Sequence, residues 1–317
     1  MFNMQELQIK KINPHLSTMQ TALAFLIVSI SKLYRIHMIR KFIGNLGFGF
    51  FLRQIARIDT FEIFFPLDIV KFKFQISSND KYWLNALLID QDYESEIYQF
   101  LKGLRVEFNF LDMGSNIGYW ALMARNNFFC KRLTLVEANG SLIPKIKANL
   151  ENNSINAEIL HAAVVSTNIS HVNFHIPSNG SQHAMSSLIS MEHSSSVQVQ
   201  AVNFDSLVTI HLENTPLAVV KMDLEGIEYE LLSTSKNLLS PNLIIIYEEH
   251  GSVKSNKSTE FLLNLDFHKI LFLVPDKPAI LIKSIENLSL LKTDEYKGYN
   301  CAAIPKGLDM NTLKHLN

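Results

Sequence analysis

The chain has few cysteines and almost no net charge, which argues against disulfide-rich, zinc-binding and nucleic-acid-binding proteins. It has only two cysteines in 317 residues, Cys130 and Cys301. They lie far apart and outside any metal-ligand spacing, so neither a disulfide framework nor a zinc site is expected, and a reducing compartment such as the cytoplasm fits best. The formal net charge is -1, so no overall basic field indicates nucleic acid as a partner.

Long hydrophobic runs are also missing. The apolar stretch 22–30 covers only about half of the roughly 20 residues that a membrane-spanning helix needs. It begins late for a signal peptide, and no small-residue cleavage site follows it. Hydrophobic residues make up 47% of the chain and charged residues 19%, which is the composition of a globular protein and excludes a disordered one.

Basic residues gather near the N-terminus. Residues 1–58 contain eight Lys or Arg and a single acid, Glu6. The basic side chains alternate with large apolar ones and include Lys32, Arg35, Arg40, Lys41, Arg53 and Arg57. This pattern predicts a pair of amphipathic helices. We favour a helical cap packed on the main domain; the alternative is contact of 16–58 with a membrane surface or a partner.

Short apolar segments alternate with amphipathic ones from about residue 105 onward. This rhythm is typical of an α/β fold, a mostly parallel sheet with helices on both faces. We predict a seven-stranded sheet, with strands over 106–113, 132–136, 157–165, 216–222, 243–247, 268–274 and 299–305.

Other segments have a different pattern. Segment 166–208 is strand-like without a clear helix, which predicts a β-hairpin insertion after the third strand. Segment 61–76 predicts one or two edge strands, and 82–104 has helical spacing that ends at Gly103. We therefore divide the chain into an N-terminal helical extension and one α/β domain. The predicted bounds are 1–58 for the extension and 59–317 for the domain, with N-terminal strands and a helix over 59–104, a core over 105–275 and C-terminal strands over 276–317.

The first predicted strand runs into a turn of small residues. It ends at Asp112, and the turn contains Gly114, Ser115, Asn116 and Gly118. Small residues let backbone amides approach a ligand, and the following helix N-terminus favours an anionic group. The group could be a dinucleotide pyrophosphate or the methionine carboxylate of S-adenosylmethionine (AdoMet), or the segment could be only a tight turn. The lack of a third glycine disfavours a dinucleotide.

The next two strands supply further ligand candidates. Glu137 ends the second strand, 25 residues after Asp112. An acid at this position can accept both ribose hydroxyls of a nucleoside, or it can be a solvated strand-end acid. Ala162 lies near the end of the third strand, where a small residue leaves room for an adenine.

Two motifs together resemble one known family. The segment 112–118 reads DMGSNIG and 220–228 reads VKMDLEGIE. The pair is similar to the motifs of FkbM-type AdoMet-dependent methyltransferases, D-V-G-A-N-I-G and K-I-D-V-E-G-A-E. Supporting segments follow in the family's order, namely 93–94, 142–153, 186–188, 203–207 and 241–250. The resemblance covers about 60–275; Ala138 replaces a frequent proline after the ribose acid.

The resemblance implies a Rossmann-like class I methyltransferase fold with AdoMet as methyl donor. It also implies O-methylation of a sugar or secondary metabolite, so the expected partner is a small-molecule or glycan acceptor. The implied cofactor-binding residues are Glu94, Asp112, Gly114, Ser115, Asn116, Gly118, Glu137, Ala138, Ala162 and Asp223.

Acids gather after the fourth and fifth strands, where ligands bind in open α/β sheets. A hydroxyl acceptor must lose its proton to a base or to a metal. In one interpretation Asp223, Glu225 or His250 is the base, with help from His183. In another, Asp223 and Glu249, with or without Glu248, hold Mg²⁺.

Three other interpretations stay open. The acids can be structural, with Glu225 capping the helix that begins near Gly226. The sheet can serve a dinucleotide or nucleotide-sugar enzyme, against which the missing third glycine counts. The chain can also be a catalytically inactive scaffold that binds a membrane surface, for which the basic N-terminus is the support.

Overall fold

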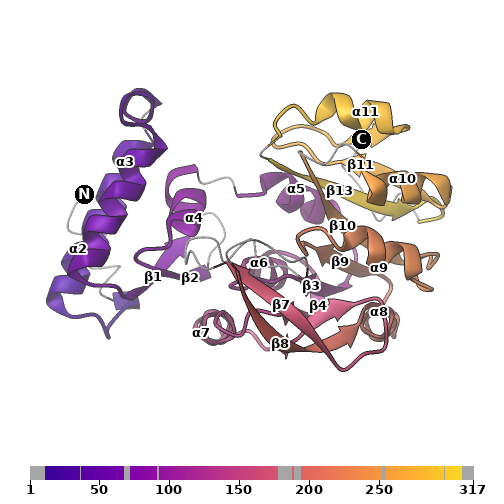
Figure 1. Ribbon diagram of the computed structural model, residues 1–317, viewed down its shortest axis with the longest axis horizontal. Coiled ribbons are helices and arrows are strands. Elements are labelled where there is room, and N and C mark those ends of the chain that lie inside the picture. The colour runs from indigo at the N-terminus through magenta and orange to yellow at the C-terminus, as the bar shows by residue number, and fades with distance from the viewer. Residues whose placement is uncertain are drawn as a thin grey trace. The chain divides into compact units, whose positions relative to one another are not determined.

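A computed structural model (Figure 1) describes residues 11–35, 37–67, 72–90, 93–177, 188, 194–251, 255–295 and 297–308. For 37–46, 64–67 and 72 the backbone alone is described. His183, Ser186 and Ser187 lie outside these ranges. The chain forms two compact units, Met1–Tyr93 and Glu94–Asn317. The units therefore part after Tyr93, whereas the sequence predicted a division near residue 58.

The first unit contains the predicted helix pair. Its elements are α2 (Thr18–Tyr34), α3 (His37–Ile58), β1 (Glu62–Leu67), β2 (Phe72–Ser77), α4 (Lys81–Leu84) and the π-helix η1 (Asn85–Asp90). A capping box starts α2, because the Ser17 hydroxyl accepts from the Gln20 N–H and the Gln20 side chain accepts from the Ser17 N–H. The predicted edge strands β1 and β2 form an antiparallel sheet of their own. No helix in the described part of the chain is long and apolar enough to cross a membrane.

The predicted helix over 82–104 is interrupted. Its residues belong to α4, η1 and, in the second unit, α5 (Ser95–Gly103). Glu94, which precedes α5, has a left-handed backbone with φ 46°. A non-glycine residue in this conformation ends a helix, and side-chain spacing does not reveal it.

The second unit is built on an eight-stranded sheet in the order β12-β11-β13-β10-β9-β3-β4-β5. The strands are β3 (Phe108–Met113), β4 (Cys130–Glu137), β5 (Glu158–His161), β9 (Ala218–Met222), β10 (Leu243–His250), β11 (His268–Phe272), β12 (Ile280–Ile282) and β13 (Gly298–Pro305). The run from β10 to β5 is parallel, and β13 is antiparallel to β10 and β11. The seven predicted strands are present, and the short edge strand β12 was not predicted.

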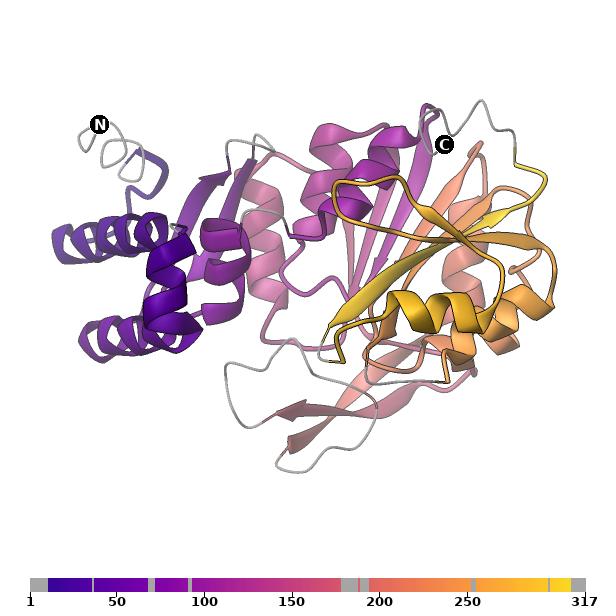
Figure 2. The same cartoon turned by 90° about the horizontal axis from the view of Figure 1, so that it is seen from above.

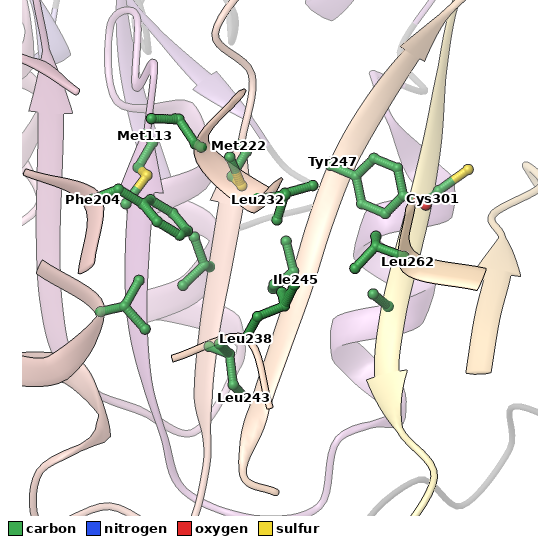
Figure 3. Packing of buried hydrophobic residues seen from close by; sticks show 14 of the residues in the cluster. Met113, Phe204, Met222, Leu232, Leu238, Leu243, Ile245, Tyr247, Leu262 and Cys301 are labelled. Atoms are coloured by element: carbon green, nitrogen blue, oxygen red, sulfur yellow. The ribbon is translucent and has the colours of Figure 1, made fainter. Parts of the chain in front are cut away.

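Helices cover both faces of this sheet (Figures 1 and 2), as predicted. They are α5, α6 (Tyr119–Asn127), α7 (Ile143–Asn152), α8 (Phe204–Leu212), α9 (Glu228–Thr234), α10 (Lys257–Asn264) and α11 (Ile285–Leu291). On one face α8, α9 and α10 supply Phe204, Leu232 and Leu262 to a continuous apolar cluster (Figure 3). On the other face α6 packs against β3 and β4.

The predicted hairpin insertion is confirmed. It consists of β7 (His171–Pro177) and β8 (Ser194–Asn203), which pair antiparallel, and β6 (Ala163–Val165) pairs parallel with β8. The expectation of no helix up to residue 208 is wrong, because α8 begins at Phe204. The Asn203 side chain caps it by accepting the Ser206 N–H at 3.0 Å.

Candidate active site at the strand ends

The small-residue turn joins β3 to α6 and lies against two other strands. Gly114 has φ +77°, and a Cβ added there would lie 1.9 Å from the backbone oxygen of Asp223. Only glycine fits both this backbone and this close approach. The N–H groups of Gly114 and Ser115 donate to the Val136 oxygen at 3.0 and 3.1 Å, which ties the turn to β4.

Glu137 stands at the tip of β4 beside this turn. Its Oε2 accepts the Asn116 N–H at 2.8 Å and its Oε1 accepts the Asn139 N–H at 2.7 Å. Burial raises its pKa to about 7, and the two N–H groups oppose the shift. The carboxylate is thus fixed in place by backbone donors. Glu137 is followed by Ala138, and the backbone carbonyl of Glu137 accepts the Ala162 N–H at 3.1 Å.

Asp112 lies beneath the turn with an unsatisfied oxygen. The residue is 1% exposed, and its Oδ2 has no hydrogen-bond partner. Burial raises its pKa to about 7, although the positive charge of Lys221 opposes the shift. A buried carboxylate oxygen without a donor is costly, so a ligand group that donates here would be bound favourably.

Lys221 and Asp223 form a buried ion pair at the end of β9. The Lys221 Nζ lies 3.1 Å from the Asp223 Oδ2, and the lysine side chain is almost fully buried. Burial disfavours the ammonium, but attraction to Asp223, Glu94 and Asp112 outweighs it and raises the lysine pKa.

Glu94 is joined to β13 by an amide that sequence reasoning missed. The Asn300 side chain donates to Glu94 Oε1 at 3.2 Å and to Glu96 Oε1 at 2.8 Å. The Trp120 indole N–H donates to the other oxygen of Glu94. Burial, together with Asp223 and Glu96, raises the pKa of Glu94 against the attraction of Lys221. Asn300 belongs to no motif, so only the sheet register reveals it.

Glu248, on β10, faces this group of acids. Burial and then Asp223 and Glu94 raise its pKa to about 9. A Cβ at Gly298 would lie 1.2 Å from the Glu248 Oε1, so the carboxylate rests where a side chain is missing. The His250 Nδ1 is 3.8 Å from the Glu248 Oε2. Two predicted site residues, Asp223 and His250, therefore both interact electrostatically with Glu248, an acid that the sequence had placed only with the metal candidates.

Two acids after β9 have different surroundings. Glu228, the first residue of α9, accepts the Leu224 N–H at 2.8 Å and the Gly226 N–H at 3.0 Å. Both donors lie in the turn before the helix, so these bonds fix that turn and do not cap α9, whose N-cap residue is Ile227. Burial, and then Asp223 and Glu228, raise the pKa of Glu225 to about 8. Glu225 has φ 56°, a strained backbone of the kind that recurs at functional sites.

Glu249 points away from these acids. Its Oε1 accepts the N–H and the hydroxyl of Thr259 on α10 at 2.9 and 2.8 Å. Neighbouring residues of a strand project to opposite faces, so Glu248 faces Asp223 and Glu249 does not. The predicted magnesium pair of Asp223 and Glu249 is therefore not formed. Among the described residues, no group of three or more His, Cys, Asp or Glu side chains is arranged to hold a metal ion.

Comparison with known proteins gives the family. Residues 112–274, just over half of the chain, match the model of the methyltransferase FkbM domain. No curated protein matches. Similar solved structures include an FkbM methyltransferase from Methylobacillus flagellatus KT, at 12% identity and TM-score 0.37 over 71% of this chain and 54% of that chain. An O-methyltransferase from Bacillus cereus in complex with SAH gives 14% identity and TM-score 0.35 over 66% and 78%.

A precorrin-6y C5,15-methyltransferase from Geobacter metallireducens GS-15 gives 12% identity and TM-score 0.38 over 68% of this chain and 89% of that chain. The family assignment depends on the sequence match to the FkbM domain. The sheet has the predicted Rossmann-like class I methyltransferase arrangement, with one additional edge strand. The chain belongs to the FkbM methyltransferase domain family.

Proposed function

We propose that this protein transfers the methyl group of AdoMet to a hydroxyl oxygen of a sugar or secondary-metabolite acceptor. The observation that carries the proposal is the glycine turn held against Glu137, with the unsatisfied Oδ2 of Asp112 beneath it. A ligand suited to this place has a donor group for Asp112 and a polyol for Glu137. An amino acid joined to a ribonucleoside has both.

The residues around the turn fit AdoMet in three respects. A buried carboxylate oxygen suits the ammonium of the methionine part, because a buried charge is stabilised by a paired opposite charge. The lone pairs that Glu137 does not use suit the ribose hydroxyls. Ala138 and Ala162 leave space for the adenine. The N–H groups of Gly114, Ser115 and Asn116 all donate to acceptors within the protein. The turn therefore contributes mainly the space that its small residues leave for the cofactor.

Bound AdoMet supplies an electrophilic methyl group on a positively charged sulfur. The protein must hold the acceptor oxygen in line with that methyl group and take the hydroxyl proton. We assign proton removal to Glu225, whose pKa of about 8 is near neutral pH, and positioning of the acceptor to Asp223 and His250. Lys221 fixes the Asp223 carboxylate through the 3.1 Å ion pair. The two buried free thiols, Cys130 and Cys301, fit a cytoplasmic setting.

Calorimetric titration with AdoMet and S-adenosylhomocysteine tests the proposal. We expect binding in roughly the micromolar range, unchanged by a chelator. A screen with methyl-labelled AdoMet over glycans and hydroxylated metabolites then seeks the acceptor. A folded protein that binds neither nucleoside would overturn the proposal. Turnover that requires a metal would overturn the assignment of proton removal to Glu225 alone.

A further inference from the structure

Charge is distributed unevenly along the chain. Residues 1–58 hold eight of the 29 Lys and Arg but only one of the 30 Asp and Glu, Glu6. The remaining 259 residues therefore hold 21 basic and 29 acidic side chains. Between residues 7 and 58 there is no acid at all. The two N-terminal helices thus form a basic segment in an otherwise acidic protein.

The outward face of α2 is apolar. Met19, Leu26 and Leu33 are 51%, 42% and 49% exposed, and their spacing of seven places them on one face of the helix. Ala24 and Val28 on the opposite face are buried. A surface helix of a globular protein normally carries polar residues on its outward face. We therefore expect another apolar surface to cover Met19, Leu26 and Leu33, which we call the α2 stripe.

The second half of α3 combines apolar and basic exposure. Phe50 is 59% exposed and Arg53 and Arg57 are also exposed, while Phe48 and Leu52 are buried. These three exposed residues lie within one side of the helix, so that side combines an aromatic ring with two guanidinium groups. Figures 1 and 2 show α2 and α3 as neighbouring helices of the same unit.

We infer that α2 and α3 bind the surface of an anionic lipid bilayer. Exposed Leu, Met and Phe side chains would enter the boundary between headgroups and acyl chains, and the Arg side chains would pair with lipid phosphates. Basic helices of this composition lie in the plane of the interface. The binding is separate from methyl transfer, because none of these residues belongs to the candidate active site.

A second copy of the chain fits this face less well. Pairing two such surfaces would bring basic residues against basic residues, and residues 7–58 offer no carboxylate to neutralise them. Anionic headgroups provide the missing charge. The α2 stripe and the α3 arginines therefore favour a lipid surface over self-association.

Vesicle flotation of the full chain tests the inference. We compare vesicles of phosphatidylcholine alone with vesicles that contain about one third phosphatidylglycerol. The protein should float with the anionic vesicles, and raising the salt concentration should release part of it. The double variant Leu26→Glu/Leu33→Glu should weaken the partition at least tenfold, since burial of each leucine contributes about that much. Arg53→Glu/Arg57→Glu should abolish the preference for anionic vesicles.

Matched controls lie in the second unit. Leu290 is 78% exposed, and the side chain of Lys131 is also exposed, so Leu290→Glu and Lys131→Glu replace an exposed leucine and an exposed basic side chain in the second unit. Both should float like the unchanged protein, and all variants should keep their melting temperature. Equal flotation with neutral and anionic vesicles, or equal losses in the controls, would overturn the inference. So would a dimer in solution that Leu26→Glu/Leu33→Glu dissociates, with no flotation.

Discussion

The two halves of the candidate site stabilise their carboxylates by different means. On the β3–β4 side, Glu137 accepts two backbone N–H groups and the turn beside it is fixed by backbone hydrogen bonds. On the β9–β10–β13 side, Asp223, Glu248 and Glu94 lie near one another and share the charge of Lys221. Backbone donors stabilise the first half whether or not a ligand is present. The second half carries negative charge that a ligand can neutralise.

This difference indicates a division of labour. Fixed backbone donors are suited to holding the unreactive parts of a cofactor, because they need no change during a reaction. Acids that are held by a side-chain ammonium instead can exchange partners with an acceptor, and Glu225, with its pKa raised to about 8, can take up a proton. Changes on the β3–β4 side should therefore act mainly on cofactor affinity, and changes on the β9–β10–β13 side mainly on turnover.

Asp223→Asn should have the largest effect. It removes the partner of Lys221 and the positioning of the acceptor, so kcat should fall by about a thousandfold, within the range that orientation of the reactants contributes. AdoMet affinity should change much less. Initial rates and calorimetry measure the two quantities. Glu249→Gln, on the other face of β10, is the control, and it should lower the melting temperature without lowering kcat. A normal kcat in Asp223→Asn would contradict the assignment of turnover to the β9–β10–β13 side.

Gly114→Ala tests the opposite half. The new Cβ would collide with the Asp223 backbone oxygen at 1.9 Å, and the residue would keep φ +77°. We expect a loss of about 3 kcal/mol in unfolding free energy, typical of strain combined with overpacking. AdoMet binding should become undetectable. Gly307→Ala is the matched control, because a Cβ there meets nothing within 4 Å. Thermal melts and titrations that show equal behaviour of the two variants would refute the role of the turn.

Glu137→Ala should weaken AdoMet binding by about tenfold to a hundredfold, with a smaller change in kcat at saturating AdoMet. It removes the proposed ribose acceptor and leaves the Asn116 and Asn139 N–H groups unsatisfied, at about 1–3 kcal/mol in stability. Circular dichroism verifies the fold, and calorimetry measures the affinity. Unchanged affinity in a folded variant would remove Glu137 from the cofactor site.

The smallest expected effect is on pH dependence. The pKa values of Asp112 and Glu137 are raised to about 7, so both are increasingly protonated below that pH. AdoMet affinity should therefore fall several-fold between about pH 8 and 6, since the protonated acids lose their pairing with the ammonium and the ribose. Stability of the free protein should change in the opposite sense. Raised carboxyl pKa values stabilise the folded state below about pH 4, and this contribution is lost as the pH rises through about 7. Affinity that is flat over this range would contradict the assignment.

The sequence predicted what depends on local pattern. Short apolar strands, the glycine turn and the acid at the tip of β4 are each encoded within a few residues, and all appear at the predicted places. The left-handed backbone of Glu94, the helix cap at Asn203 and the short strand β12 were not foreseen, because each departs from hydrophobic periodicity.

The face of the sheet that each acid occupies could not be predicted. The run 243–247 is apolar at every position because β10 is covered on both faces, so alternation does not indicate where Glu248 and Glu249 point. Gly298 and Asn300 reach the site through the register of β13 with β10, in which Asn300 lies opposite Glu248. Such a pairing between distant segments leaves no local pattern in the sequence.

The place of β13 also has a consequence for synthesis on the ribosome. Asn300 bridges Glu94 and Glu96, and it follows Glu94 by 206 residues. At roughly 5–20 residues per second, translation of that interval takes roughly 10–40 s. Late in this interval the nascent chain holds the glycine turn and the acids up to Glu248, but it still lacks β13, the strand that supplies the Asn300 amide and the space at Gly298 beside Glu248. The candidate site is therefore completed only after Asn300 has been translated.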